Sequence, residues 1–348
     1  MKKTLAIVGY GGQGAWHADW AQKSDCVTLA GIYDISEKRV NAAKEKGIHV
    51  YESREDLLAD KSVDVVVCAT PNDSHKEIVI SALQAGKHVV CEKPVALSLA
   101  DFDEMCAAAA EAGKIFTVHQ NRRYDVDYLA MQSIVNSGEI GEVLNVESRI
   151  HGSRGIPSDW RCHKPQGGGM ILDWGVHLID QMLQLIPEVV TRVYCEINNI
   201  TTDEVDDGFN LHLTFASGKR ATVEVGTYNF LPLPRFYMQA KSGSALIEDW
   251  QKKCRVSKLK AWCEKEVVPV QTAAGITKTM APRDEITLDM YEIDRPCSDV
   301  HDFYRNFTAA IDGKCQQKIK LPEVRRVLRV MEYAFKSWDE KNAISVEI

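Results

Sequence analysis

Three glycines that follow the first apolar run constrain the fold of this chain more than any other feature. Gly9, Gly11 and Gly14 fit the pattern GxGxxG between an expected strand, residues 5–9, and an expected helix, residues 13–23. In that context the first glycine permits a tight turn, the second admits a pyrophosphate to the backbone, and the third lets helix and strand pack closely. The pattern predicts a dinucleotide site whose phosphates face the helix N-terminus. A glycine-rich turn without a ligand is the plainer alternative.

Short β-branched runs alternate with helical stretches over the first 122 residues. The expected strands are Leu5–Gly9, Val27–Tyr33, Val63–Thr70, His88–Cys91 and Ile115–Val118, and the expected helices are Gln13–Lys23, Glu37–Lys46, Ser74–Gln84 and Ala100–Ala112. Strands separated by helices imply right-handed crossovers between parallel strands. The sequence therefore predicts a doubly wound parallel sheet covered on both faces.

After residue 123 the pattern changes to longer runs of alternating polar and apolar residues. These runs are Glu142–His151, Arg192–Asn198, Phe209–Phe215, Arg220–Thr227 and Phe236–Ile247. Ser217-Gly218 is typical of a hairpin turn, and two C-terminal helices are expected at about 299–311 and 322–339. We therefore expect a second α/β domain with a large open, mostly antiparallel sheet. The predicted domains are residues 1–122 and 123–348, which suits a chain of 348 residues.

The composition excludes several classes of function. Hydrophobic residues make up 45% and charged residues 26% of the chain, which argues against a disordered or fibrous protein. The net charge is −7 and no Lys/Arg-rich run is present, so we expect no nucleic acid or membrane partner. Ten cysteines are scattered without a CxxC pair, which indicates neither a metal site nor a disulfide framework. A cytoplasmic location is the simplest expectation.

Asp34 at the end of the second expected strand bears on the choice of dinucleotide. It lies 20 residues after Gly14, where a carboxylate accepts hydrogen bonds from the ribose 2′-hydroxyl and repels a 2′-phosphate. The position favours NAD over NADP, although Lys38 and Arg39 lie nearby and could accommodate a phosphate. A turn-forming aspartate is the alternative interpretation.

Two further strand ends carry polar residues. Thr70-Pro71-Asn72, with His75, follows the third expected strand, and Glu92-Lys93-Pro94 follows the fourth. Ligands bind at the carboxyl edge of open α/β sheets. A lysine there can hold a substrate oxygen on which negative charge develops, whereas a solvated surface lysine is the alternative.

A glycine run, residues 167–169, precedes a segment of helical length from Met170 to Ile186. Its polar residues recur at helical spacing and share one face: Asp173, His177, Asp180 and Gln184. The rest of the segment is apolar, so these polar groups must be paired or used. An i, i+4 pair of aspartate and histidine could set the histidine pKa near neutral for acid/base work, and a structural histidine is the alternative.

In this order and spacing, the motifs resemble the glucose-fructose oxidoreductase / inositol dehydrogenase / MocA (Gfo/Idh/MocA) family over essentially the whole chain. The stretch 119–125 is similar to the segment that joins the two domains in that family and lines its substrate cleft. The resemblance implies a Rossmann domain, a second α/β domain whose open sheet builds homodimers or homotetramers, and NAD(P) at the domain junction beside a sugar or cyclitol.

The resemblance also implies roles for individual residues. The implied catalytic residues are Lys93, Asp173 and His177. The expected cofactor contacts are Gly9, Gly11, Gly12, Gln13, Gly14, Asp34, Thr70, Asn72, His75, Glu92, Lys93 and Gln120. The expected substrate contacts are Lys93, Arg122, Tyr124, Trp160, Arg161, Asp173 and His177. Tyr10 departs from the usual pattern, because its bulky side chain must turn away from the glycine loop.

Three functions are compatible with these residues. The first is reversible hydride transfer between NAD and a secondary hydroxyl of a sugar, a glycoside at C3, or an inositol. The second is an NAD-dependent glycosidase that oxidises C3 transiently and eliminates the aglycone. The third is a sugar or nucleotide sensor that keeps the fold without the chemistry. An uncharged polyol is the favoured substrate, although Arg122, Arg123 or Arg161 could hold a carboxylate.

Overall fold

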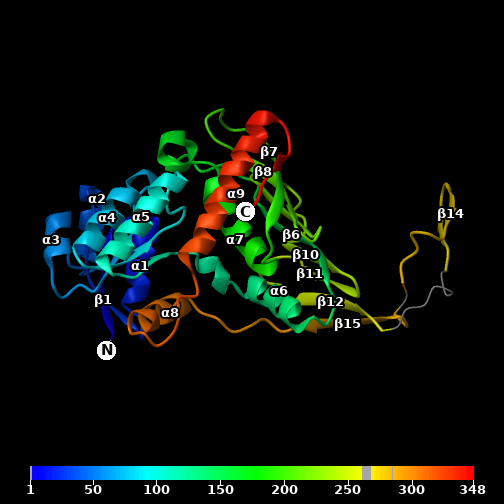
Figure 1. Ribbon diagram of the computed structural model, residues 1–348, viewed down its shortest axis with the longest axis horizontal. Coiled ribbons are helices and arrows are strands. Elements are labelled where there is room, and N and C mark those ends of the chain that lie inside the picture. The colour runs from blue at the N-terminus through cyan, green and yellow to red at the C-terminus, as the bar shows by residue number, and fades with distance from the viewer. Residues whose placement is uncertain (1, 261–267, 284) are drawn as a thin grey trace.

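The N-terminal part of the chain forms a parallel sheet with helices on both faces (Figure 1). The computed structural model describes residues 2–260, 268–283 and 285–348. Within them this sheet has five strands in the order β2-β1-β3-β4-β5. The strands are β1 (Lys3–Val8), β2 (Val27–Tyr33), β3 (Val65–Cys68), β4 (His88–Cys91) and β5 (Phe116–Val118). The predicted doubly wound sheet is confirmed.

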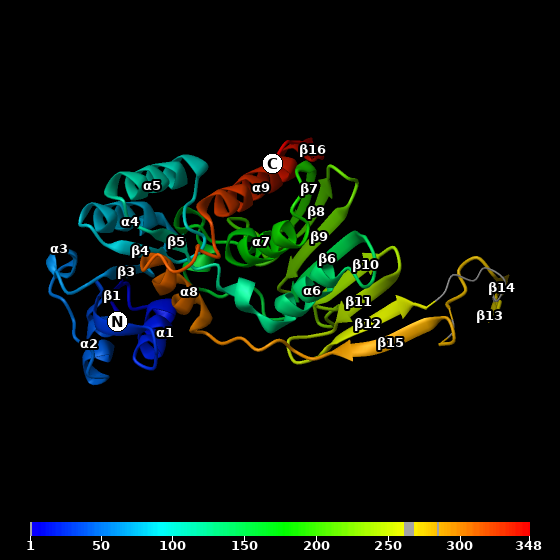
Figure 2. The same ribbon diagram turned by 60° about the horizontal axis from the view of Figure 1, so that its bottom comes forward.

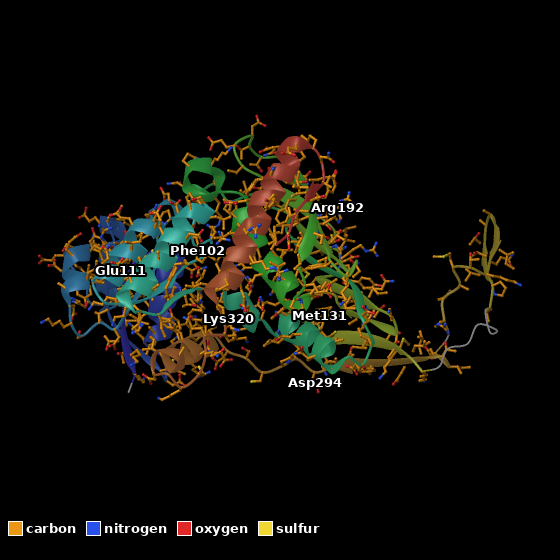
Figure 3. All side chains as sticks on the ribbon, in the orientation of Figure 1. Phe102, Glu111, Met131, Arg192, Asp294 and Lys320 are labelled. Atoms are coloured by element: carbon orange, nitrogen blue, oxygen red, sulfur yellow. The ribbon has the colours of Figure 1, made fainter. Side chains whose placement is uncertain are left out.

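The helices of this part are α1 (Gly12–Ala21), α2 (Glu37–Glu45), α3 (Arg54–Ala59), α4 (His75–Gln84) and α5 (Leu99–Ala112). Helices α1, α3 and α4 contact the strands, whose apolar residues are buried. On α5, Phe102 is fully buried and its ring lies 6.3 Å from that of Phe116, whereas Glu111 is exposed (Figure 3). The short helix α3 was not expected, and it begins where the Ser53 hydroxyl accepts a hydrogen bond from the Asp56 amide.

The C-terminal part forms a larger sheet, with nine strands in the described residues, in the order β15-β12-β11-β10-β6-β9-β8-β7-β16. The strands are β6 (Val143–His151), β7 (Val190–Asn198), β8 (Gly208–Phe215), β9 (Arg220–Gly226), β10 (Phe236–Ala240), β11 (Gly243–Ile247), β12 (Cys254–Leu259), β15 (Leu288–Ile293) and β16 (Ile344–Ser345). All neighbouring pairs are antiparallel except β6 and β9. The prediction of a mostly antiparallel sheet is confirmed.

Three helices cover one face of the larger sheet (Figure 2). They are α6 (Val126–Ser137), α7 (Val176–Leu185) and α9 (Leu321–Glu340). The alternating burial along β7, β8 and β9 explains this arrangement, because every second side chain faces the helices. The hairpin predicted at Ser217-Gly218 joins β8 to β9. No helix of residues 2–260, 268–283 and 285–348 is long and apolar enough to cross a membrane.

Three expectations about this part need correction. The run Phe236–Ile247 is two strands, β10 and β11, because the chain turns at residues 241–242. The single helix expected from Met170 to Ile186 is a π-helical turn, Ile171–Gly175, followed by α7. Strands β12 and β15, and the small hairpin of β13 (Val270–Thr272) and β14 (Gly275–Thr277), were not predicted. Their mixed polar sequences, at the edge of the sheet and beyond it, give no clear alternation.

The two C-terminal helices return to the first sheet, as predicted. Helix α8 (Asp302–Ile311) packs beside α1, and the Tyr304 hydroxyl lies 2.7 Å from His17 Nδ1 (Figure 2). Helix α9 contacts both α5 and β5. The C-terminal residues therefore hold the two sheets together, and the division at residue 122 stays a prediction.

Arg123, just after the first sheet, is the centre of a buried ion-pair network at this junction. Its Nε and Nη2 atoms donate to the two oxygens of Asp180 at 2.7 and 2.6 Å. Its Nη1 atom donates to Glu323 at 2.5 Å and to the Lys318 carbonyl at 3.0 Å. The network joins the start of the second domain to α7 and to the N-terminus of α9.

Replacing Arg123→Met should lower the free energy of unfolding by about 3–5 kcal/mol, because Asp180 would remain buried without its cation. Urea unfolding followed by circular dichroism measures this loss. The double variant R123M/D180L should recover most of the stability, since the buried carboxylate is then removed with its cation and Glu323, which also loses its partner, is partly exposed to water. A single-variant cost below about 1 kcal/mol would contradict the structural role given to this pair.

Candidate active site

The glycine loop between β1 and α1 has no room for side chains at two of its positions. Gly9 adopts φ +95°, and a Cβ atom there would lie 2.6 Å from the Ala69 carbonyl oxygen. A Cβ atom on Gly14 would lie 1.8 Å from the Gly9 carbonyl oxygen. The first turn of α1 has no side-chain cap, so its amide groups are available to an anion. This geometry fits a pyrophosphate, as the motif predicts.

Asp34 braces the glycine loop. Its Oδ2 atom accepts a hydrogen bond from the Tyr10 amide at 2.6 Å, and its Oδ1 atom accepts one from the Ser36 amide at 2.8 Å. The half-exposed Arg39 guanidinium lies 3.4 Å from Oδ2. Each carboxylate oxygen has a second lone pair, so Asp34 can also accept from a ribose hydroxyl. The Tyr10 side chain is buried, as its position in the loop requires.

Two adjoining cavities follow the carboxyl edge of the first sheet. One, of about 400 Å³, is lined by Gly9, Asp34, Arg39, Arg54 and Thr70 among others. The other, of about 340 Å³, is lined by Gly11, Gly12, Gln13, Asn72, Glu92, Lys93, Trp160, Arg161 and Asp173 among others. Both include Arg39, Thr70 and Pro71, so they are continuous. Together they bring most of the predicted cofactor residues onto the wall of one elongated site.

Lys93 and Asp173 meet across this site from different domains. Lys93 Nζ donates to Asp173 Oδ1 at 2.7 Å and to the Asp173 carbonyl at 2.8 Å. Arg161 Nε donates to Asp173 Oδ2 at 3.1 Å. Burial alone would raise the pKa of Asp173, but the charges of Lys93 and Arg161 hold it below its usual value. Asp173 is therefore ionised, and it holds both cations in place.

His177 lies at the start of α7, one helical turn after Asp173. Its ring is buried, and its Nδ1 atom has no hydrogen-bond partner among residues 2–260, 268–283 and 285–348. Burial, together with the charges of Lys93 and Arg122, lowers the pKa of His177 well below its usual value. The imidazole is therefore neutral at pH 7 and has a lone pair that can accept a proton.

The expected coupling between Asp173 and His177 is wrong. Both carboxylate oxygens of Asp173 are engaged by Lys93 and Arg161, and the pKa of His177 is far from neutral. The residues up to Gly175 are π-helical, so α-helical spacing does not apply to this pair. Asp180, also on the predicted polar face, pairs with Arg123 outside the site.

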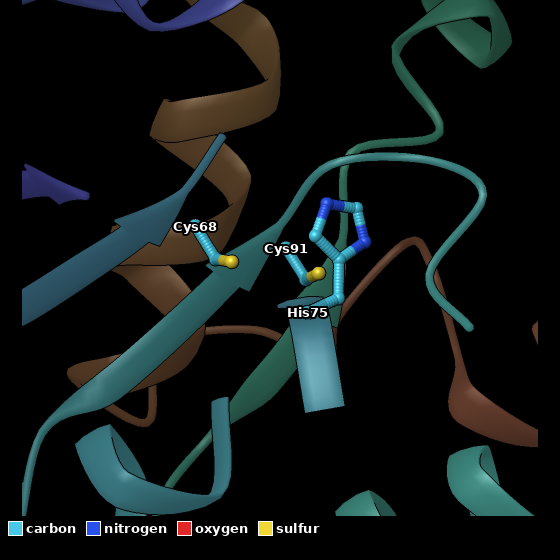
Figure 4. A group of neighbouring side chains, drawn as sticks. All are labelled: Cys68, His75 and Cys91. Carbon is cyan, nitrogen blue, oxygen red and sulfur yellow. The ribbon is translucent and has the colours of Figure 1, made fainter. Parts of the chain in front are cut away.

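His75, expected to contact the cofactor, braces two loops instead (Figure 4). The side chain is buried, with Nδ1 at 3.1 Å from the Pro94 carbonyl oxygen and Nε2 at 3.0 Å from that of Thr70. These carbonyls belong to the loops that follow β4 and β3, which also carry Lys93 and Asn72. His75 therefore fixes the relative position of the two loops that line the site.

Cys68 and Cys91 lie beside His75 (Figure 4). Each of the three side chains has one atom that could bind a metal ion, and these three atoms lie within 4.8 Å of one another. Burial raises the pKa of the Cys68 thiol, but a hydrogen bond from Cys91 and the charge of His75 lower it to about 6. Both ring nitrogens of His75 already face carbonyl oxygens, so neither lone pair is directed at the sulfurs. The expectation of no metal stays a prediction.

Other predicted residues divide between the site and its surroundings. Asn72 Nδ2 donates to the Gly167 carbonyl at 3.1 Å, which ties the first domain to the glycine run of the second. Gln120 is fully buried, and in the part of the chain that the structure describes neither polar atom of its amide has a hydrogen-bond partner, as expected of a group that binds a ligand. Tyr124 instead lines a separate cavity of about 230 Å³ with Trp16 and Phe303.

Trp160 and Arg161 line the same cavity as Asp173, and Arg122 stacks on Trp174, the residue after Asp173. The Arg161 guanidinium lies 4.5 Å from the centre of the Trp160 ring. The Arg122 guanidinium lies 4.3 Å from the Trp174 ring, and its Nη1 atom pairs with Asp125 at 2.9 Å. Such a wall presents flat apolar faces and hydrogen-bond donors, which suits the ring of a polyol.

The sequence analysis did not identify several residues whose hydrogen bonds and ion pairs support the site. Asp206 Oδ2 accepts a hydrogen bond from the Ile171 amide at 2.7 Å, which fixes the start of the π-helical turn. Burial raises the pKa of Asp206 to about 7. His17 and His119 each lie 2.8 Å from Glu92 Oε1. No local pattern marks these residues, because their partners are distant in the sequence.

Comparison with known proteins places this geometry among oxidoreductases. Residues 3–120 match the family model for an oxidoreductase family with an NAD-binding Rossmann fold, and residues 128–245 match the model for the GFO/IDH/MocA C-terminal domain. An NAD-binding protein from Listeria innocua has a similar solved structure, with a TM-score of 0.95 and 42% identity over 99% of both chains.

Two curated relatives have named activities. Myo-inositol 2-dehydrogenase of Thermotoga maritima is 32% identical over 58% of this chain and 60% of that protein. 2,7-anhydro-N-acetylneuraminate hydratase of Escherichia coli is 32% identical over 70% of this chain and 66% of that protein. The matched region spans little more than half the length of the first curated relatives.

Replacing Gly14→Ala should destabilise the fold by about 1–3 kcal/mol or more, because its methyl group would overlap the Gly9 carbonyl. Gly12→Ala in the same loop is the matched control, since nothing lies within 4 Å of its Cβ position. Thermal unfolding of the two variants without cofactor measures the difference. Equal melting temperatures would show that the loop relaxes and that the close packing is not required.

Proposed function

The chain belongs to the Gfo/Idh/MocA family of oxidoreductases and has its NAD-binding Rossmann domain. We propose that it is an NAD-dependent dehydrogenase that reversibly oxidises a secondary hydroxyl of a sugar, of a glycoside at C3, or of an inositol. The observation that carries this proposal is the meeting of Lys93 and Asp173 on the wall of the cavity that adjoins the glycine loop, with the neutral His177 buried near enough for the charge of Lys93 to lower its pKa.

Proton transfer is the part of the reaction that the protein itself performs. When bound, NAD supplies the hydride acceptor. The neutral imidazole of His177 accepts the hydroxyl proton of the substrate, and burial keeps this base free of competing protons at pH 7. Lys93 Nζ donates two of its three hydrogens to Asp173, so one hydrogen remains to stabilise the developing alkoxide.

Asp173 and its neighbours orient the substrate. Each carboxylate oxygen of Asp173 accepts one hydrogen bond from a cation and retains a lone pair for a substrate hydroxyl. Trp160 and Arg161 belong to the wall of the same cavity, and Arg122 stacks on Trp174 next in sequence to Asp173. We assign these residues to substrate binding, and we do not assign Tyr124, which lines another cavity.

The cofactor half of the site follows from the same reasoning. The glycine loop and the N-terminus of α1 hold the pyrophosphate, and Asp34 accepts the ribose hydroxyl and so selects NAD over NADP. The buried, unpartnered amide of Gln120 provides further donors and acceptors. We further propose a cytoplasmic enzyme that forms a homodimer or homotetramer through the open face of the larger sheet.

A second function rests on one of the relatives. A hydratase is among them, and hydration involves no net oxidation. The same residues would then serve a redox-neutral reaction, in which NAD would be reduced and reoxidised within one turnover. A glycosidase that works through transient oxidation at C3 is such an enzyme. Such an enzyme would release an aglycone without accumulating NADH.

Absorbance at 340 nm distinguishes the two functions. The purified protein is mixed with NAD or NADP and a panel of inositols, free hexoses, aryl glucosides and sugar acids. A rise with NAD and a polyol is the expected result for the dehydrogenase. Release of the aryl group at constant absorbance would favour the redox-neutral function, and silence in both assays would favour a sensor.

Replacing His177→Ala should lower turnover by about 10²- to 10⁴-fold while NADH still binds, because only the proton acceptor is removed. The exposed His49, between α2 and α3, offers a matched control, and His49→Ala should leave turnover unchanged. Steady-state kinetics with the best substrate of the panel measures both variants. Near-normal turnover in the His177 variant would remove it from the mechanism.

A further inference from the structure

A rear cavity of about 450 Å³ adjoins the segment that carries Asp173. Leu172 lies on its wall, whereas the next residue, Asp173, lies on the wall of the cavity beside the glycine loop. Gly167 also lines the rear cavity, and its carbonyl accepts the hydrogen bond from Asn72, which lines the cavity beside the glycine loop. The two cavities are therefore neighbours across one short segment. None of the expected cofactor or substrate contacts lies on the described wall of the rear cavity.

Part of the wall of the rear cavity is apolar. The apolar side chains come from the π-helical turn, from β7, from the loop that follows β7 and from α9: Leu172, Ile197, Val205, Phe335 and Trp338. The Lys341 ammonium lies 2.9 Å from the centre of the Trp338 ring, so this cation covers one face of the indole. The volume and this lining suit a small molecule with a hydrocarbon or aromatic body.

The charged side chains on the same wall are mainly acidic. One cation, Lys164, faces four carboxylates: Asp203, Glu204, Asp206 and Asp339. No lysine or arginine of the described residues forms an ion pair with any of these four carboxylates. Glu204 lies 3.7 Å from His163, and both of these side chains are largely exposed. The rear cavity therefore has an excess of negative charge, which a positively charged ligand would complement.

Asp206 is the buried member of this acidic group. Its side chain is 4% exposed, whereas Asp203, Glu204 and Asp339 are exposed at the mouth of the cavity. The Oδ2 atom of Asp206 accepts a hydrogen bond from the Ile171 amide, but Oδ1 accepts none from the residues that the structure describes. Burial raises the pKa of Asp206 to about 7. A buried carboxylate without a cation is costly, and an ammonium group would satisfy both its charge and its free oxygen.

Asp206 also connects the rear cavity to the active site. The Met170 amide donates to the Asp206 carbonyl at 3.1 Å, and the Ile171 amide donates to Asp206 Oδ2 at 2.7 Å. These two hydrogen bonds hold the start of the π-helical turn that carries Asp173. A cation bound to Asp206 would change the charge of the group that fixes this turn. Occupation of the rear cavity is thereby coupled to the position of Asp173.

We propose that the rear cavity binds a small organic ammonium ion with an apolar body, and that this ligand is an effector of the active site. The ammonium group pairs with Asp206, and the body packs against the apolar wall that includes Leu172 and Phe335. The binding site stands without the proposed function. The effect on turnover rests on the proposed function, because it acts through the substrate contact Asp173.

Phenethylamine is the probe for binding, and 2-phenylethanol, which has the same body without the charge, is its matched control. Ligand-observed NMR titrations of the purified protein, without cofactor, measure both dissociation constants at pH 8, above the pKa of Asp206. We expect the Kd of the alcohol to exceed that of the amine by about tenfold or more, because only the amine makes a charged hydrogen bond. Equal constants, or no binding of the amine, would overturn the proposal.

Variants locate the bound amine. Asp206→Asn should raise the Kd of phenethylamine by about tenfold and leave that of 2-phenylethanol within about threefold. If this variant does not fold, the exposed pair Asp203→Asn and Asp339→Asn should together raise the Kd of the amine by about threefold or more. Glu340→Gln is the matched control, because Glu340 follows Asp339 on α9 but pairs with Lys336. Unchanged amine binding in the variants that fold would place the amine elsewhere and overturn the proposal.

Steady-state kinetics tests the effector role separately. With the best substrate of the panel, saturating phenethylamine should change KM by about fivefold or more, and the double variant D203N/D339N should need more amine for the same change. Unchanged KM and kcat with the amine bound would overturn the effector role. A wild-type protein without turnover on any substrate would instead overturn the proposed function, while the dissociation constants would still decide whether the rear cavity is a binding site.

Discussion

The ion pair between Lys93 and Asp173 is the contact on which the rest of the site depends. It joins the end of a strand in the first domain to a π-helical turn in the second, and both groups are largely removed from water. Burying either charge alone would be costly, so the fold must present the two together. Arg161 completes the pairing from a third segment. This interaction therefore links the relative position of the domains to the position of the candidate catalytic groups.

Around this pair, buried polar groups fall into two kinds. In some of them every polar atom faces a partner within the protein, as in His75, which lies between two carbonyl oxygens. Others retain unused atoms, as Gln120 and His177 do. The first kind gives the loops a single geometry, and the second kind leaves capacity for ligands. Unused hydrogen-bonding atoms therefore distinguish candidate ligand contacts from supporting residues better than residue type does. His75 belongs to the supporting residues and His177 to the candidate contacts, although both are histidines.

The sequence predicted those features that depend on local sterics and periodicity, and missed those that depend on distant partners. The glycine loop and the parallel strands follow from backbone freedom and apolar runs, so both were confirmed. The segment around Asp173 has helical composition, but its contacts with Lys93 and Arg161 belong to a π-helical turn that spacing alone does not reveal. Tyr124 belongs to the interdomain segment, yet its ring packs against that of Phe303, which lies 179 residues later in the sequence.

The return of α8 to the first sheet has a consequence for how the chain is made on the ribosome. His17 is synthesised early, but its hydroxyl partner Tyr304 emerges 287 residues later. The N-terminal domain is complete at about residue 122, and Tyr304 follows 182 residues later. At a synthesis rate of about 5–20 residues per second, this domain exists for about 9–36 s with this side of α1 uncovered. During that interval the surface that α8 will cover is open to chaperones and to other nascent chains. The N-terminal domain is thus the first to form, but α8 covers this side of α1 only near the end of synthesis.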